Sequence, residues 1–209
     1  IAPPEESSLW TGRKELWQPP RSGLVDTVDG GTTWVPAYVP VIGRNHLHLG
    51  VELALAYWGL TGDAVGVFDD RLEIVRPAGL PVMQLPLRER QLLEVNWFST
   101  WISPARNPRL GFSTVLSQAE RLNSSRAAER LPAAEFFANP DFKGAIVLIG
   151  PVDPLLHDLA PTPFDAAPVP RVGVLGNLVK TIFSGQFIRR LPVWADYALL
   201  CALAMVISV

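Results

Sequence analysis

Four side chains that could do acid–base chemistry follow an apolar run at residues 144–150. They are Asp153, His157, Asp158 and Asp165. A carboxylate beside a histidine can act as a general acid or base, and the same residue types also cap turns and helices. No nucleophile motif, phosphate-binding loop or metal-binding motif accompanies them. The sequence therefore favours a binding loop or a rigid connector over a catalytic loop.

The place of this loop in the chain is informative. The run "GAIVLIG" at 144–150 is typical of a strand buried on both faces. In open α/β sheets, ligands bind beyond the carboxyl ends of such strands. We therefore take His157, Asp158 and Thr162 as candidate ligand-binding residues. The alternative is a proline-stiffened connector that only closes the sheet.

Two asparagines complete the candidate set. Asn177 interrupts an otherwise apolar helix face, and a buried amide needs hydrogen-bond partners. It could bond back to the loop around Asp158 and Thr162, or face a ligand. Asn96 stands at a strand end beside tryptophan and could line a small-molecule pocket or belong to the core.

Composition excludes several other functions. The formal net charge is -2 and 18% of residues are charged, which gives no electrostatic footprint for nucleic acid. His46 and His48 are two apart on an expected helix, so they do not face each other as metal ligands would. The only cysteine, Cys201, lies in the apolar tail, so no disulfide is expected. We expect no cofactor and no metal.

The elements that must position these residues indicate an α/β fold. Helical spacing recurs at 44–60, with Asn45 as a cap, at 117–142, and at 171–185. Strand candidates lie at 64–76 and 92–101, and Asp29-Gly30-Gly31 is typical of a hairpin turn. We predict a mixed sheet with a buried central strand at 144–150, flanked by helices.

The two ends of the chain differ from its middle. Residues 1–22 are rich in proline and charge and indicate an arm, while 23–190 is the folded domain. Residues 191–209 are almost wholly apolar and predict the start of a transmembrane helix. No signal-peptide pattern opens the chain, so we expect an internal piece of a larger membrane protein.

A set of short motifs then carries a family resemblance. Lys143-Gly144, Ile149-Gly150, Asp158, Thr162-Pro163, Val172-Gly173-Val174, Gly176-Asn177, Ser184-Gly185 and Arg189-Arg190 follow one another in order. Their order and spacing resemble the C-terminal portion of the second CHASE-type domain, the cyclases/histidine kinases associated sensory extracellular domain. The resemblance covers roughly residues 24–209, and Gly176 stands where that family usually has alanine.

The resemblance implies a non-catalytic sensor of a bacterial inner-membrane protein, placed on the extracytoplasmic (periplasmic) side. It implies a cytoplasmic output domain in the same polypeptide, such as a nucleotide cyclase or kinase, reached through the helix after residue 192. The expected partners are that output domain, the membrane, a small ligand and, as an open alternative, a second copy of the chain.

Two rival functions remain open from the residues themselves. The first is a hydrolase that uses Asp158 and His157. The second is a structural or partner-binding module in which the tryptophan-rich stretch 10–38, including Trp17 and Trp34, docks another protein.

Overall fold

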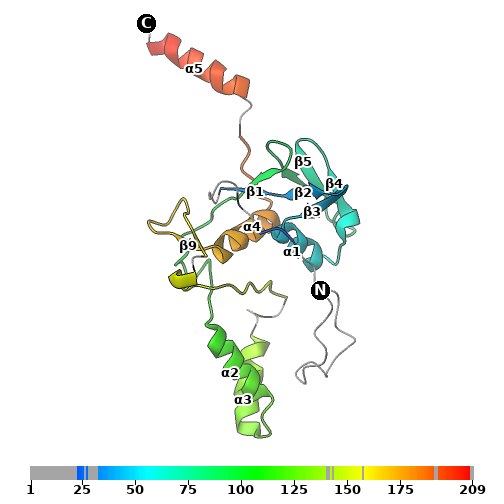
Figure 1. The fold of residues 1–209 in the computed structure, drawn as a ribbon, viewed down its shortest axis with the longest axis vertical. Helices are drawn as coiled ribbons and strands as arrows, with labels where there is room; N and C mark the ends of the chain where they lie inside the picture. Colours follow the sequence, from blue (N-terminus) through cyan, green and yellow to red (C-terminus); the bar gives the residue numbers. More distant parts are fainter. Residues whose placement is uncertain are drawn as a thin grey trace.

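A computed structural model of the chain describes residues 23–25, 27, 33–139, 142, 144–156, 158–190 and 193–207. The expected arm at 1–22, the Asp29-Gly30-Gly31 turn and His157 lie outside these residues. The described part is a mixed α/β fold, as the sequence predicts, and its sheets are small and antiparallel. The core occupies the middle of Figure 1, with a helical hairpin on one side and the C-terminal helix on the other.

The strands form four separate antiparallel sheets rather than one mixed sheet. They are β1 (Trp34–Pro36) with β7 (Leu92–Glu94), β2 (Tyr38–Val41) with β3 (Arg44–Leu47), the meander β4 (Val65–Val67), β5 (Arg71–Ile74) and β6 (Met83–Pro86), and the short pair β8 (Leu159–Ala160) with β9 (Val169–Pro170). Two 3₁₀ turns, η3 (Gly62–Ala64) and η4 (Pro154–Leu156), lie in the connections.

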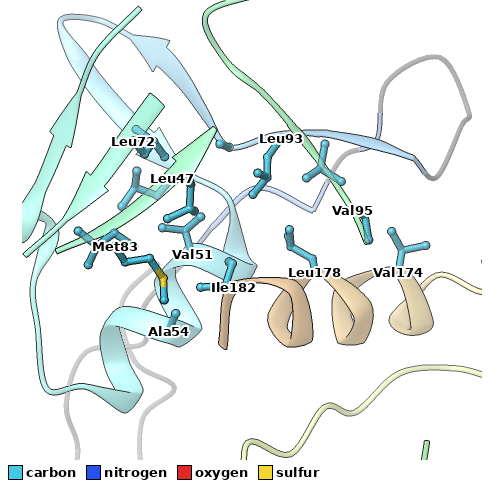
Figure 2. Packing of buried hydrophobic residues seen from close by; sticks show 14 of the residues in the cluster. Leu47, Val51, Ala54, Leu72, Met83, Leu93, Val95, Val174, Leu178 and Ile182 are labelled. Atoms are coloured by element: carbon cyan, nitrogen blue, oxygen red, sulfur yellow. The ribbon is translucent and has the colours of Figure 1, made fainter. Parts of the chain in front are cut away.

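Two helices join these sheets into one hydrophobic core. Helix α1 (Leu49–Tyr57) packs against helix α4 (Val172–Ser184). Figure 2 shows Val174, Leu178 and Ile182 of α4 pointing toward side chains from the strands and from α1. The apolar spacing of the 171–185 segment is thus confirmed, and Gly185 ends the helix with a left-handed φ of 65°.

The prediction of a helix over 44–60 is half right. Residues 44–47 are strand β3, which follows β2 through a turn at Ile42 and Gly43, with φ of 47° and 73°. Helix α1 starts only at Leu49, and its cap is His48, whose Nδ1 accepts the backbone N–H of Gly50 at 3.1 Å. Asn45 is therefore not the cap, because pairing with β2 holds its backbone in the hairpin.

The expected central strand at 144–150 is wrong. No described residue pairs with this run, and the side chains of Val147 and Ile149 are 60% and 77% exposed. Only one side of the run lies on α4, where Gly150 approaches Val172 and Leu148 lies beside Gly176. A strand buried on both faces needs neighbouring strands and a covering layer, and the described residues supply neither.

Two helical parts lie outside the core. Helices α2 (Phe112–Leu122) and α3 (Ala127–Ala138) pack on each other as a hairpin, and Pro132 lies inside α3. Helix α5 (Val193–Ile207) stands apart from the core (Figure 1). Its 15 residues extend about 22 Å, against about 30 Å for a bilayer core.

The expected start of a transmembrane helix at 191–209 is therefore not supported. Among the helices that the structure describes, none is long and apolar enough to cross a membrane.

Candidate functional site

The segment that joins α4 to α5 is held against the end of strand β7 at two points. We call residues 186–190 the connector. At one end, Asn96 Nδ2 donates a hydrogen bond to the Gln186 carbonyl oxygen at 2.8 Å. At the other end, Arg190 donates from Nε and Nη2 to the two carboxylate oxygens of Glu94, at 2.9 and 2.5 Å. The connector is thus fixed where it leaves the core and again before α5.

The Glu94–Arg190 ion pair is asymmetric in its exposure. The Glu94 side chain is only 5% exposed, whereas that of Arg190 is 55% exposed. Burying a carboxylate without a partner costs free energy. Arg190 of the connector therefore stabilises Glu94 at its buried position in β7. The hydrogen bond and the charge of Glu94 raise the pKa of Arg190.

Trp34 of strand β1 lies beneath two guanidinium groups. The Arg190 group lies 5.5 Å from the centre of its ring and the Arg88 group 5.7 Å. Both are cation–π distances. Because β1 pairs with β7, Trp34 stands opposite Glu94 in the sheet. The Trp34 ring therefore packs against the Arg190 guanidinium, which bonds to Glu94.

We call the contact of Arg190 with Glu94 and Trp34 the joint. A cavity of about 460 Å³ opens beside it. Its walls come from two sheets, β1–β7 and β4–β5–β6, and from the connector, which contributes Ile188, Arg189 and Arg190. Its size falls in the range of small-molecule pockets. The cavity therefore lies between the sheets of the core and the segment that leads to α5.

Arginine dominates the charge of the cavity. Its lining contains Arg71, Arg88, Arg189 and Arg190 but only two carboxylates, Asp70 and Glu94. Arg71 bonds to Glu73 and Asp70, both at 2.8 Å, and Glu73 and then Asp70 raise its pKa. Within the described part of the chain, neither Arg88 nor Arg189 has a carboxylate partner. The walls therefore carry two unneutralised positive charges.

Thr162 forms hydrogen bonds with Asp165 of the same loop. Its hydroxyl donates to Asp165 Oδ2 at 2.6 Å and accepts the Asp165 N–H at 3.0 Å. The same carboxylate accepts the Trp101 N–H at 3.0 Å. The Trp101 ring lies against Gly173 of α4 and carries the Arg109 guanidinium 4.9 Å from its centre. Thr162 and Asp165 thus anchor the loop before α2 to the connection between β8 and β9, and the Trp101 ring packs this loop on the start of α4.

A lysine of α4 fastens the same loop further along. Lys180 Nζ donates to Asn107 Oδ1 and to the Arg106 carbonyl oxygen. Burial, and then the nearby Arg106 charge, lower the pKa of Lys180. The loop is therefore attached to both ends of α4.

Asp158 also serves the fold around α4. Its carbonyl oxygen accepts the Arg171 N–H at 2.9 Å, and its carboxylate lies 3.9 Å from the Arg171 guanidinium. Arg171 also donates to Thr27 at 3.3 Å. His157 lies outside the described residues, so its pairing with Asp158 as a hydrolase dyad stays a prediction.

Asn177 bonds within its own helix, not to the loop that contains Asp158 and Thr162. Its Nδ2 donates to the Gly173 carbonyl oxygen at 2.9 Å, and the side chain is buried. Its backbone oxygen accepts the Thr181 hydroxyl at 2.7 Å. Thr181 Oγ1 in turn accepts the Asn96 N–H at 3.0 Å, which ties α4 to the chain after β7.

The structure does not gather the candidate residues into one site. Asp158, Thr162, Asn177 and Asn96 have separate partners, and none of these four lines the cavity. Asn96 comes nearest, since it holds the connector.

The residues of the joint left only weak signals in the sequence. Glu94 is a lone acid in the apolar stretch "LLEVNW", and Arg190 belongs to the Arg189-Arg190 pair of the family motif. The sequence indicates Trp34 only as a residue that docks another protein. In the structure it is half-buried under its two arginines.

Comparison with known proteins gives a family but no individual relative. The family model described as "CHASE2 domain" matches residues 11–209. No curated protein and no solved structure matches the chain. The match covers almost the whole sequence and agrees with the motifs from Lys143-Gly144 to Arg189-Arg190. The chain therefore belongs to the CHASE2 family of sensory domains.

Proposed function

We propose that this domain is the extracytoplasmic sensor of a bacterial inner-membrane signalling protein. In this proposal a stimulus changes how the connector is held, and α5 passes that change to an output domain of the same polypeptide, a nucleotide cyclase or a kinase. CHASE2 domains are generally extracellular sensory domains of membrane proteins, which supports the side of the membrane and the class of function.

The observation that carries the proposal is the two-point attachment of the connector. Signalling by population shift needs an element with two arrangements whose balance a stimulus can bias. With the Arg190–Glu94 bonds made, the start of α5 follows the position of β7. Without them, the connector is held only near Gln186, and α5 gains freedom relative to the core.

A distance measurement tests this attachment directly. Cys201 is the only cysteine and is exposed on α5, so it accepts a spin label. A second label at Asp63→Cys, on the exposed η3 turn, reports the position of the core. We expect a narrow distance distribution in the parent protein and a broad or shifted one in Glu94→Gln. Glu73→Gln, which removes a carboxylate paired with Arg71, is the matched control.

Identical distributions in Glu94→Gln and in the control would overturn the proposed joint. An output assay tests its consequence in the full-length protein. A Gly-Ser insertion after Gly185 should uncouple the output from the domain, whereas the same insertion between Ser124 and Ser125, in the α2–α3 connection, should not. Regulation that survives the first insertion would refute transmission through the connector.

A further inference from the structure

The cavity beside the connector has the charge and the shape to hold a small anion. Four arginines and two carboxylates line it, so its formal charge is positive by two. Arg71 and Arg190 are already bonded to Glu73, Asp70 and Glu94. The excess therefore belongs to Arg88 and Arg189, for which the described residues offer no carboxylate.

Trp34 prepares one of these arginines for binding. A guanidinium stacked on an aromatic face keeps its N–H groups at its edge, where they remain free to donate. The Arg88 guanidinium lies over the Trp34 ring, 5.7 Å from its centre, and the Arg88 side chain makes no hydrogen bond or ion pair with the described residues. Arginine recognises carboxylate and phosphate groups by paired N–H donors. Trp34 thus holds the Arg88 guanidinium in place, and its N–H donors make no hydrogen bond with the described residues.

Arg189 adds a second, movable binding group. It belongs to the connector, while Arg88 follows strand β6 and belongs to the core side of the cavity, and both residues are exposed. A ligand that bonds to both would bridge the core and the connector. Its second contact would lie beside Arg190 and would compete with Glu94 for that guanidinium.

We infer that the cavity binds a small dianion, a dicarboxylate or a phosphate compound, between Arg88 and Arg189. This inference deepens the proposed function, because it names the class of stimulus that acts on the connector. The two walls carry the two charges that such a ligand neutralises, and a volume of about 460 Å³ accommodates a metabolite of that size.

Calorimetric titration of the full chain tests the binding. The probes are succinate, malonate and inorganic phosphate, with acetate and succinamide as singly charged and neutral controls, all at one ionic strength. We expect saturable binding of a dianion, weakened at least about tenfold in Arg88→Gln and again in Arg189→Gln. Arg109→Gln is the matched control, because Arg109 also stacks on a tryptophan, Trp101, but lies away from the cavity.

The outcomes identify the chemical class of the ligand, and they separate ligand binding from the signalling role. Tighter binding of succinate or malonate assigns a dicarboxylate, and tighter binding of phosphate assigns a phosphate compound. No saturable binding of any dianion, or equal loss in Arg88→Gln and Arg109→Gln, would overturn the inference. If Glu94→Gln moves the Cys201 label while no dianion binds, the proposed joint stands and only this inference fails. If a dianion binds without moving the label, the site stands and the signalling role fails.

Discussion

The carboxylate of Glu94 and the guanidinium of Arg190 meet through two hydrogen bonds across 96 positions of the sequence. This pair joins the end of strand β7 to the last residue of the connector. With the hydrogen bond from Asn96 to Gln186, it holds the segment before helix α5 to the core.

Replacing Glu94 with glutamine tests the pair itself. The amide keeps the size of the side chain but loses the charge that Arg190 neutralises. We expect a fall in Tm of several degrees, measured by calorimetry. Glu73→Gln should have a much smaller effect, because the Glu73 side chain is 24% exposed whereas that of Glu94 is 5% exposed. Equal falls in Tm in the two variants would show that the burial of Glu94 does not contribute to stability.

Replacing Thr181 with valine tests the tie between α4 and the chain after β7. Valine has the same shape, but the part-buried Asn96 N–H then loses the acceptor that the buried Thr181 hydroxyl provides. An orphaned donor costs about 1–3 kcal/mol, which denaturant unfolding would detect. Thr114→Val, at an exposed position of α2, is the control and should change the unfolding free energy little. An unchanged stability in Thr181→Val would contradict the hydrogen bond.

Two glycine-to-alanine changes should have opposite signs. A Cβ at Gly50 would lie 2.5 Å from the Leu178 Cδ2 atom, whose side chain is fully buried. Overpacking of about 1–3 kcal/mol then outweighs the helix propensity of alanine, which is at most about 1 kcal/mol. At Gly176 the nearest side-chain atom, Leu148 Cδ1, is 3.6 Å away. Gly176→Ala should therefore stabilise the protein by about 0.5–1 kcal/mol. The prediction fails if thermal unfolding shows both variants moving in the same direction.

Replacing Asp165 with asparagine should release the loop before α2. The new amide group offers one acceptor oxygen where the carboxylate accepts both the Trp101 N–H and the Thr162 hydroxyl. We expect amide exchange at Trp101 to quicken by about tenfold or more, which corresponds to about 1.4 kcal/mol. Asp153→Asn is the control, since it caps only an exposed turn at Leu155. Unchanged exchange at Trp101 would show that the loop is held by other contacts.

Periodic elements could be predicted from the sequence. The spacing of Val174, Leu178 and Ile182, followed by Gly185, fixes a helix, because burial on one face and a left-handed stop are local properties. The start of α1 was misplaced because Asn45 and His48 are both polar residues before an apolar run. Only pairing with β2 decides which of them caps the helix.

Long-range relationships could not be predicted in the same way. The run at 144–150 is apolar enough for a central strand, but a strand also needs neighbours, which its own residues do not specify. The candidate residues Asp158, Thr162 and Asn177 are polar for local reasons, as turn and helix partners. The joint instead depends on a long-range contact between Glu94 and Arg190. Nothing in the sequence around either residue identifies the other as its partner.

The side chains of Arg190 and Glu94 differ in exposure, so anions and cations in solution have unequal access to the ion pair. Arg190 can be approached from solvent, while the Glu94 carboxylate is covered. An anion in solution can therefore compete for the arginine, but a cation has no comparable path to the glutamate. In the proposed joint, negatively charged effectors would therefore open the ion pair, whereas sodium, potassium or polyamines would not. The burial of Glu94 would set this preference for anions over cations.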